Sequence, residues 1–227
     1  GYTTDDNARA LIVSALLDDM GNPEAFELAS RYLAFVWYAY NAETGRFRNF
    51  MTYQRTWLEV YGSDDSHGRA LWALGAVLGR SHTPALHSMA SWLFEQALPA
   101  ILDTTSPRAW AFALIGIQEY LRRFAGDRRA SQVQEKLSRR LLVLYQHCRS
   151  DDWQWYEEGL TYCNAVLSHA SLICGQSVQS AEMIEAGLES LAWLTNIQRA
   201  SKGGHFVPIG SNGFYRKNGE RARFDQQ

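Results

Sequence analysis

The most constraining feature of this sequence is an acidic helix opening that recurs along the chain. One copy, Tyr61–Leu78, reads YGSDDSHGRALWALGAVL, and a related copy, GYTTDDNARALIVSALL, begins at Gly1. In each copy a Ser or Thr and two Asp precede an Arg and an apolar run with helical spacing, with one extra residue in the Tyr61 copy. Further openings start at Ser106 and near Glu157. The four copies lie roughly 40 to 60 residues apart, which indicates a helical repeat architecture.

Helices and polar loops alternate through the whole chain. We expect helices at residues 7–20, 23–40, 64–78, 84–102, 107–124, 128–148, 160–174 and 179–198, a strand-like stretch at 43–62, and a β-hairpin or long loop at 202–219. The odd-numbered helices are apolar on more sides than the even-numbered ones, which indicates an inner and an outer layer. We therefore predict an all-α fold, an incomplete α/α toroid of about four helical hairpins out of six. The whole of 1–227 should be a single domain and a fragment of a longer chain.

The composition excludes several classes of function. A net charge of −2 gives no electrostatic basis for a nucleic-acid or membrane-surface partner. Cys148, Cys163 and Cys174 lack metal-ligand spacing, and we expect Cys163 and Cys174 to be small core residues. Because metal, phosphate-loop and dinucleotide motifs are absent from the sequence, we expect neither a metal nor a cofactor. No segment has the length and apolarity for membrane insertion and no signal peptide is present, so a cytoplasmic protein is the default.

Four motifs carry a resemblance that covers nearly the full chain. GYTTDDNARAL, YGSDDSHGRALWALG, WYEEGLTYCNAVLSHA and the terminal RFDQQ resemble the six-hairpin α/α-toroid domain of bacterial polypeptides that also carry a group 1 glycosyltransferase domain. More broadly, the chain is similar to α/α-toroid glycoside hydrolases and sugar epimerases. The resemblance implies an oligosaccharide or glycan ligand at the inner-helix mouth of the toroid. It also implies a fused or associated glycosyltransferase domain as a partner.

The acids at the helix openings are the candidate catalytic groups. Glycoside hydrolysis needs one carboxyl that donates a proton and one carboxylate that activates water or attacks the sugar. Neighbouring acids in a confined site drive their pKa values apart, which separates these two roles. We expect Asp64 and Asp65 to form the best pair, with Glu158 as the distant partner and Asp225 as its alternative. The structural alternative for each Asp is a helix cap.

Aromatic and polar side chains in or beside the motif loops are the candidate substrate-binding groups. Flat rings can stack on a sugar face, and polar groups can hydrogen-bond its hydroxyls. The predicted binding residues are Asp5, Asp6, Arg55, Trp57, His67, Trp110, Trp155, Glu157, Tyr162 and Asn164. Arg9 and Arg69 occupy matching places in the repeated opening, and we expect them to pair with the acids beside them.

These patterns predict a carbohydrate-active domain of the glycoside-hydrolase type, which cleaves or rearranges a glycosidic substrate with paired carboxylates at the mouth. A noncatalytic glycan-binding or assembly domain beside a glycosyltransferase is the alternative. Terpene cyclases also use acid-rich helical cavities. However, the Arg, Asn and His residues that interrupt the acids here favour a polyhydroxylated ligand over a hydrocarbon.

Overall fold

The structure, a computed structural model, describes residues 1–221, so the predicted catalytic residue Asp225 lies outside the described residues. The described chain is helical with a few two-residue strands, which confirms the predicted all-α, toroid-like class. It divides into two compact units, Gly1–Leu137 and the part that begins at Ser138. Helix α6 (Arg128–Cys148) crosses this boundary. The expectation of a single domain stays a prediction.

The first unit holds an ordered succession of helices and two short antiparallel ladders, β1 with β4 and β2 with β3. Its elements are β1 (Tyr2–Thr3), α1 (Thr4–Asp19), α2 (Ala25–Ala39), β2 (Tyr40–Asn41), β3 (Arg46–Phe47), β4 (Phe50–Met51), α3 (Asp64–Arg80), α4 (Pro84–Ala97), the 3₁₀ helix η1 (Leu98–Asp103) and α5 (Pro107–Leu121).

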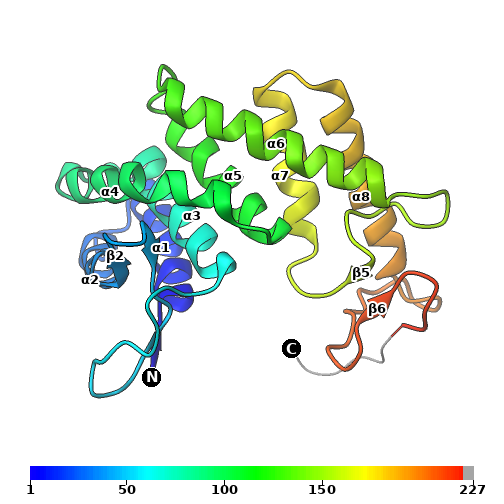
Figure 1. Ribbon diagram of the computed structural model, residues 1–227, viewed down its shortest axis with the longest axis horizontal. Coiled ribbons are helices and arrows are strands. Elements are labelled where there is room, and N and C mark those ends of the chain that lie inside the picture. Colours follow the sequence, from blue (N-terminus) through cyan, green and yellow to red (C-terminus); the bar gives the residue numbers. More distant parts are fainter. Residues whose placement is uncertain (222–227) are drawn as a thin grey trace. The chain divides into compact units, whose positions relative to one another are not determined.

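The odd-numbered helices of the first unit form one layer. Helix α3 packs against both α1 and α5, while α2 packs on α1 and α4 packs on α3 (Figure 1). Because α3 has neighbours on several sides, it is buried from Ser66 to Leu71 and again from Ala73 to Leu78. Helix α2 buries only one stripe, which includes Ala25, Ala29 and Leu33. The predicted contrast between inner and outer helices is therefore observed for α3 and α5, whereas α1 is buried to an extent similar to α2.

Glycine sets the distance between α3 and α5. A Cβ atom added to Gly75 would lie 2.0 Å from the carbonyl oxygen of Gly116, and one added to Gly116 would lie 2.5 Å from the carbonyl oxygen of Leu71. Such distances are far below van der Waals contact, so the two backbones touch directly. Only glycine lets the helices approach this closely.

Hydroxyl side chains cap all three inner helices of the first unit. Thr3, Ser63 and Ser106 each accept a hydrogen bond from the amide three residues further along the chain, at 3.0, 3.1 and 3.3 Å. These bonds satisfy amides that a helix start leaves unpaired. When Thr3 is placed on Ser63, Arg9 coincides with Arg69. The extra residue expected in the second copy of the motif is therefore not needed.

A second polar cluster ties the inner helices together at their opposite, C-terminal ends. Asp18 in α1 accepts hydrogen bonds from the hydroxyl of Ser81 and the amide of His82 after α3, the latter at 2.8 Å. Arg80 in α3 donates to both carboxylate oxygens of Glu119 in α5, each at 2.8 Å. Burial acts to raise the pKa of Asp18, but the hydrogen bonds that the Asp18 carboxylate accepts outweigh it and hold the pKa below its ordinary value.

The second unit is built on the packing of α7 (Ala165–Ser177) against α8 (Ala181–Ile197). Its core contains a small hydroxyl network in which Tyr156 lies 2.7 Å from Ser171 and accepts a hydrogen bond from Ser190 at 3.2 Å. Strand β5 (Gly159–Leu160) pairs with β6 (Tyr215–Arg216) from the tail. The tail is otherwise mostly irregular, in line with the predicted long loop.

The expected start of the seventh helix at residue 160 is wrong. Residues 159–160 pair as a strand, and the amide of Thr161 donates to the side-chain oxygen of Asn164 at 3.0 Å, so the chain turns before α7 begins at Ala165. Cys163 lies in this turn with a φ of 45° and is exposed, which corrects its assignment to the core. Cys174, within α7, is buried as predicted.

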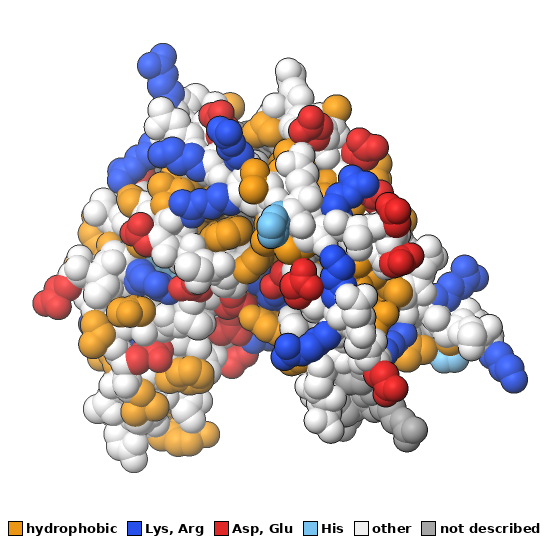
Figure 2. Space-filling view, turned by 45° about the vertical axis from the view of Figure 1, so that its right-hand side comes forward, with side chains coloured by type: hydrophobic (Ala, Val, Ile, Leu, Met, Phe, Trp, Pro, Cys, Tyr) orange, Lys and Arg blue, Asp and Glu red, His pale blue; other side chains and the backbone are white. Residues whose placement is uncertain are grey.

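Charged side chains of both signs are interspersed over the face shown in Figure 2. This distribution accords with the small net charge of −2. Among the described residues, no helix combines the length and apolar character that a membrane span requires.

Candidate functional site

The N-terminal ends of α1, α3 and α5 meet at one end of the first unit. The amide of Ser106, at the start of α5, donates to the Oδ2 atom of Asp64 in α3 at 3.2 Å. Asp5 in α1 is ion-paired with Arg69 in α3, with 2.6 Å between Oδ1 and Nε. We call the end defined by Asp5, Asp6, Asp64 and Asp65 the acidic mouth. Three positive helix ends therefore converge on four carboxylates.

Asp64 accepts hydrogen bonds at both of its carboxylate oxygens. Its Oδ1 atom accepts from Arg46 at 2.8 Å, and its Oδ2 atom accepts from the amides of Thr105 at 2.9 Å and Ser106. Burial acts to raise the pKa of Asp64, but the hydrogen bonds from Thr105, Arg46 and Ser106 outweigh it and hold the pKa below its ordinary value. Asp64 is thus an ionised group that joins strand β3 to the first turn of α5, and it is poorly suited to donate a proton.

Asp65 differs from its neighbour in its contacts. Its Oδ1 atom accepts a hydrogen bond from the hydroxyl of Ser106 at 2.6 Å, and the side chain is only partly buried. Asp64 holds the backbone of Ser106, while Asp65 accepts from its side chain. The two carboxylates therefore converge on one residue.

Asp5 and Asp6 are held by Arg9, as the sequence predicted, and Asp5 is also held by Arg69 from a different helix. Arg9 pairs with Asp5 and with Asp6, in the latter case at 3.1 Å, on one face of α1. Arg69 reaches across from α3 to Asp5, and its guanidinium lies 4.0 Å from the ring centre of Phe112. Cation–π contact and the ion pair both hold Arg69, which is largely buried.

His67 lies in the first turn of α3 but is completely buried. Its ring is 5.5 Å from that of Phe47, centre to centre, and neither ring nitrogen makes a hydrogen bond of ordinary geometry in the described part of the chain. Burial, reinforced by the charge of Arg46, lowers the pKa of His67 to about 3. The backbone of Ala97 and the charge of Asp64 act in the opposite direction but are weaker. His67 is therefore a neutral packing residue beneath the acidic mouth at neutral pH.

The predicted binding residues of the loop at 50–60 lie beside α1 and α2. Arg55 is exposed at a tight turn with a φ of 63°. Trp57 packs against Phe35 and Tyr38 of α2, with ring centres 5.8 and 5.5 Å apart.

Trp110, in the first turn of α5, donates its indole N–H to the carbonyl of Thr104 at 3.0 Å. Trp110 is the predicted aromatic residue that the structure places on a helix of the acidic mouth.

The remaining predicted residues belong to the second unit. Trp155 is fully buried and makes an edge contact with Tyr156, which leaves it no exposed face for a sugar. The other side chains differ in exposure: Glu157 is partly buried, Glu158 and Tyr162 are exposed, and Asn164 is buried at the turn before α7. The structure does not place these residues relative to the acidic mouth.

Three residues that support the acidic mouth were not predicted as site residues. Arg46 binds Asp64, and the side-chain oxygen of Asn49 accepts from the amide of Asp5 at 3.1 Å. Glu59 in turn accepts from the amides of Asn49 and Phe50, at 2.5 and 2.9 Å. All three lie in the stretch 43–62, where alternating Arg and aromatic residues were the available signal. No group of His, Cys, Asp or Glu suited to a metal ion occurs among residues 1–221.

Replacing Asp64 by Ala should destabilise the protein substantially. The change leaves Arg46 and two amides of the α5 opening without their acceptor, and only 24% of the Asp64 side chain is exposed. We expect the free energy of unfolding to fall by about 2 to 3 kcal/mol, measured by urea denaturation. Asp6→Ala is the matched control, because that side chain is 69% exposed and should cost less than about 1 kcal/mol. Equal losses for the two variants would contradict a bridging role for Asp64.

Comparisons with known proteins give a match at the level of structure. No protein-family model matches the sequence, and a search of curated proteins finds no match either. The fold is similar to that of a solved structure, a sugar epimerase from a ruminal bacterium, with a TM-score of 0.72 and 11% sequence identity. The similarity covers 97% of this chain and 65% of the epimerase chain. At this identity the comparison establishes the fold alone.

Proposed function

We propose that this chain is a carbohydrate-active domain that binds a glycan at the acidic mouth and cleaves a glycosidic bond there. The observation that carries the proposal is the convergence of Asp64 and Asp65 on Ser106, at the joined N-terminal ends of the inner helices. The fold similarity to a sugar epimerase supports a carbohydrate as the ligand. The mixture of carboxylates and arginines also suits a ligand with many hydroxyl groups.

In this proposal Asp65 is the catalytic carboxyl and Asp64 is a positioning residue. Asp65 is partly accessible and would exchange a proton with the glycosidic oxygen. Asp64 has both oxygens occupied and stays ionised, so it serves by holding Ser106 in place. In this proposal the predicted pair divides into two roles, with Asp64 bonded to Arg46 and to the backbone before α5 and Asp65 bonded to the hydroxyl of Ser106.

Hydrolysis requires a second carboxyl group. Within the first unit, Asp6 is the most exposed acid of the mouth, whereas both oxygens of Asp5 face arginines. We propose Asp6 as the second carboxyl. Glu158 and Asp225 stay the sequence-based alternatives for this role.

A noncatalytic glycan-binding domain is the second candidate. It is favoured by the structural use of Asp5 and Asp64, because a carboxylate held by arginine or backbone amides has little capacity left for proton transfer. Such a domain could serve an associated glycosyltransferase, which the sequence resemblance predicts and which stays a prediction.

Asp65→Asn separates catalysis from binding alone. The substitution keeps the shape and the acceptor for Ser106 but removes the titratable proton. Turnover of the best substrate in a panel of neutral oligosaccharides should fall about a hundredfold or more. Its dissociation constant, measured by calorimetry, should change by less than about tenfold.

Asp103→Asn is the control for this experiment, because Asp103 is an exposed acid in η1 outside the mouth. It should leave both turnover and affinity unchanged. Unchanged turnover in Asp65→Asn would exclude Asp65 as the catalytic group. Glycan binding by the unmodified chain without any turnover would favour the noncatalytic domain, and the absence of glycan binding would contradict both.

A further inference from the structure

A hairpin next to the acidic mouth carries an open pocket. Strand β4 pairs with β1, so that Phe50 lies opposite Thr3. The amide of Leu58 donates a hydrogen bond to the carbonyl of Phe50 at 3.0 Å. The turn between is closed by a bond from the amide of Thr52 to the carbonyl of Thr56 at 2.9 Å. Their hydroxyls lie 2.7 Å apart. These bonds give the hairpin at 50–58 a fixed shape.

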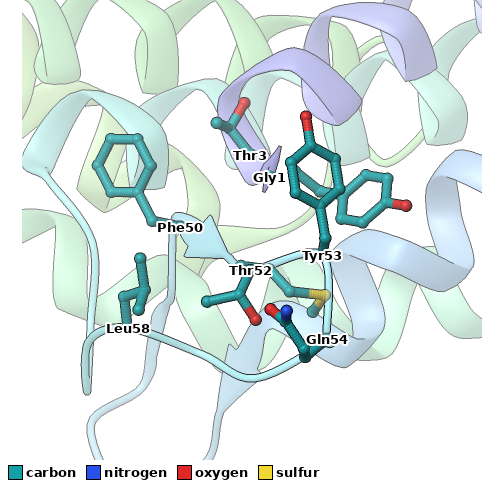
Figure 3. Close-up of a pocket in the computed structure, with 9 residues that line it drawn as sticks. Gly1, Thr3, Phe50, Thr52, Tyr53, Gln54 and Leu58 are labelled. Carbon is teal, nitrogen blue, oxygen red and sulfur yellow. The ribbon is translucent and has the colours of Figure 1, made fainter.

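The pocket at this hairpin has a volume of about 440 Å³. Its walls are formed chiefly by Tyr2, Phe50, Tyr53, Gln54 and Leu58, and no lining residue carries a charged side chain (Figure 3). Tyr53 is 76% exposed, and its ring meets that of Tyr2 edge to face with centres 5.8 Å apart. Large exposed aromatic rings beside an open pocket are typical of a ligand-binding site.

Hydrogen bonds connect the pocket to the acidic mouth. Thr3 lines the pocket, caps α1, and donates its hydroxyl to Asp6 at 2.6 Å. Asn49, directly before Phe50, holds the amide of Asp5. A ligand that occupied the mouth at Asp6 would therefore need to extend only past Thr3 to reach the rings of the hairpin.

We propose that the hairpin pocket is a subsite for one neutral sugar ring of the glycan whose reacting unit lies at the acidic mouth. This inference rests on the proposed function. Sugar rings combine an apolar C–H face with hydroxyl groups, and the pocket offers the matching pair of surfaces. The Tyr53 and Phe50 rings provide the stacking surface, and the amide of Gln54 and the hydroxyl of Tyr53 provide hydrogen-bonding groups.

Tyr53→Ala tests the subsite directly. The probes are neutral cello-, xylo- and manno-oligosaccharides of increasing length, titrated calorimetrically into the 227-residue chain. In the unmodified protein the affinity should rise when the oligosaccharide becomes long enough to span both sites. In Tyr53→Ala this gain in affinity should shrink by about two- to tenfold, which is the change expected for the loss of one aromatic contact. The shortest oligosaccharide that binds should keep its affinity.

Three further variants complete the test. Tyr53→Phe keeps the ring and should retain most of the length-dependent gain in affinity. Gln54→Ala removes a hydrogen-bonding group from the same pocket and should lose part of that gain. Phe26→Ala is the matched control, since Phe26 is 48% exposed on α2, outside the pocket. Oligosaccharide binding that Tyr53→Ala leaves unchanged at every length would overturn the subsite and leave the proposed function intact. A chain that binds none of the probes would overturn the proposed function, and the subsite with it.

Discussion

Gly75→Ala is expected to disrupt the inner layer, although alanine is the better helix former. On propensity alone the change would favour α3 by about 1 kcal/mol. The new Cβ would lie 2.0 Å from the carbonyl oxygen of Gly116, however, and a backbone atom cannot rotate away as a side chain can. The two helices must separate along their contact, which opens space around buried residues such as Leu71 and Leu74. We expect a loss of about 4 kcal/mol or more in the free energy of unfolding.

Urea denaturation of Gly75→Ala and Gly126→Ala provides the comparison. A Cβ at Gly126 meets no atom within 4 Å, so this variant should be neutral or slightly stabilised. The site should respond as well, because the α3–α5 contact places Ser106 beside Asp64 and Asp65. A Gly75→Ala protein as stable as the unmodified chain would show that the two backbones do not meet as described.

His67 should make the protein less stable as the pH falls from neutrality. Its pKa is about 3 in the folded chain, whereas an exposed histidine has a pKa of 6.5. Below pH 6.5 the unfolded state binds a proton that the folded state does not, so the free energy of unfolding decreases. The slope should be about 1.4 kcal/mol per pH unit between roughly pH 6 and pH 4, a loss that approaches 3 kcal/mol over that interval.

The measurement is urea denaturation at several pH values between about 4 and 7 for the unmodified chain, His67→Phe and His147→Gln. His67→Phe replaces a buried ring that packs against Phe47 by one that does not titrate, and it should lose most of the slope. His147 is exposed in α6, so His147→Gln should keep the slope. Asp18 and Asp64, whose pKa values are lowered, affect the free energy of unfolding at a lower pH. Their contribution to stability is lost only as the pH falls below about 3.8. A slope that survives in His67→Phe would contradict a neutral, buried His67.

The sequence was sufficient for the parts of the fold that depend on local chemistry. Hydroxyl residues Ser63 and Ser106 and the apolar periodicity behind them located the starts of α3 and α5, whereas α1 begins at Thr4, three residues before the expected start. The apolar character of α3 on several sides also indicated its inner position, where the backbone of Gly75 meets that of Gly116. The turn around Cys163 was missed, because β5 forms only through pairing with a tail strand far along the chain.

The candidate site was predictable only in outline. Doubled acids at repeated openings correctly indicated that the carboxylates of α1 and α3 share one end of the inner layer. Their individual roles depend on contacts between elements, such as Arg46 with Asp64 over a separation of 18 residues. Helical spacing alone did not distinguish a buried His67 from an accessible one, since neighbouring elements, including the strand that carries Phe47, cover its ring.

A crystal structure of the chain with the tightest-binding neutral oligosaccharide tests the central claim most directly. We predict that a sugar unit lies at the N-terminal ends of α1, α3 and α5, with a hydroxyl or glycosidic oxygen within hydrogen-bond distance of Asp65. An oligosaccharide bound instead at the opposite ends of these helices, beside Asp18 and Glu119, or on the outer helices α2 and α4, would contradict the assignment of the acidic mouth as the functional site.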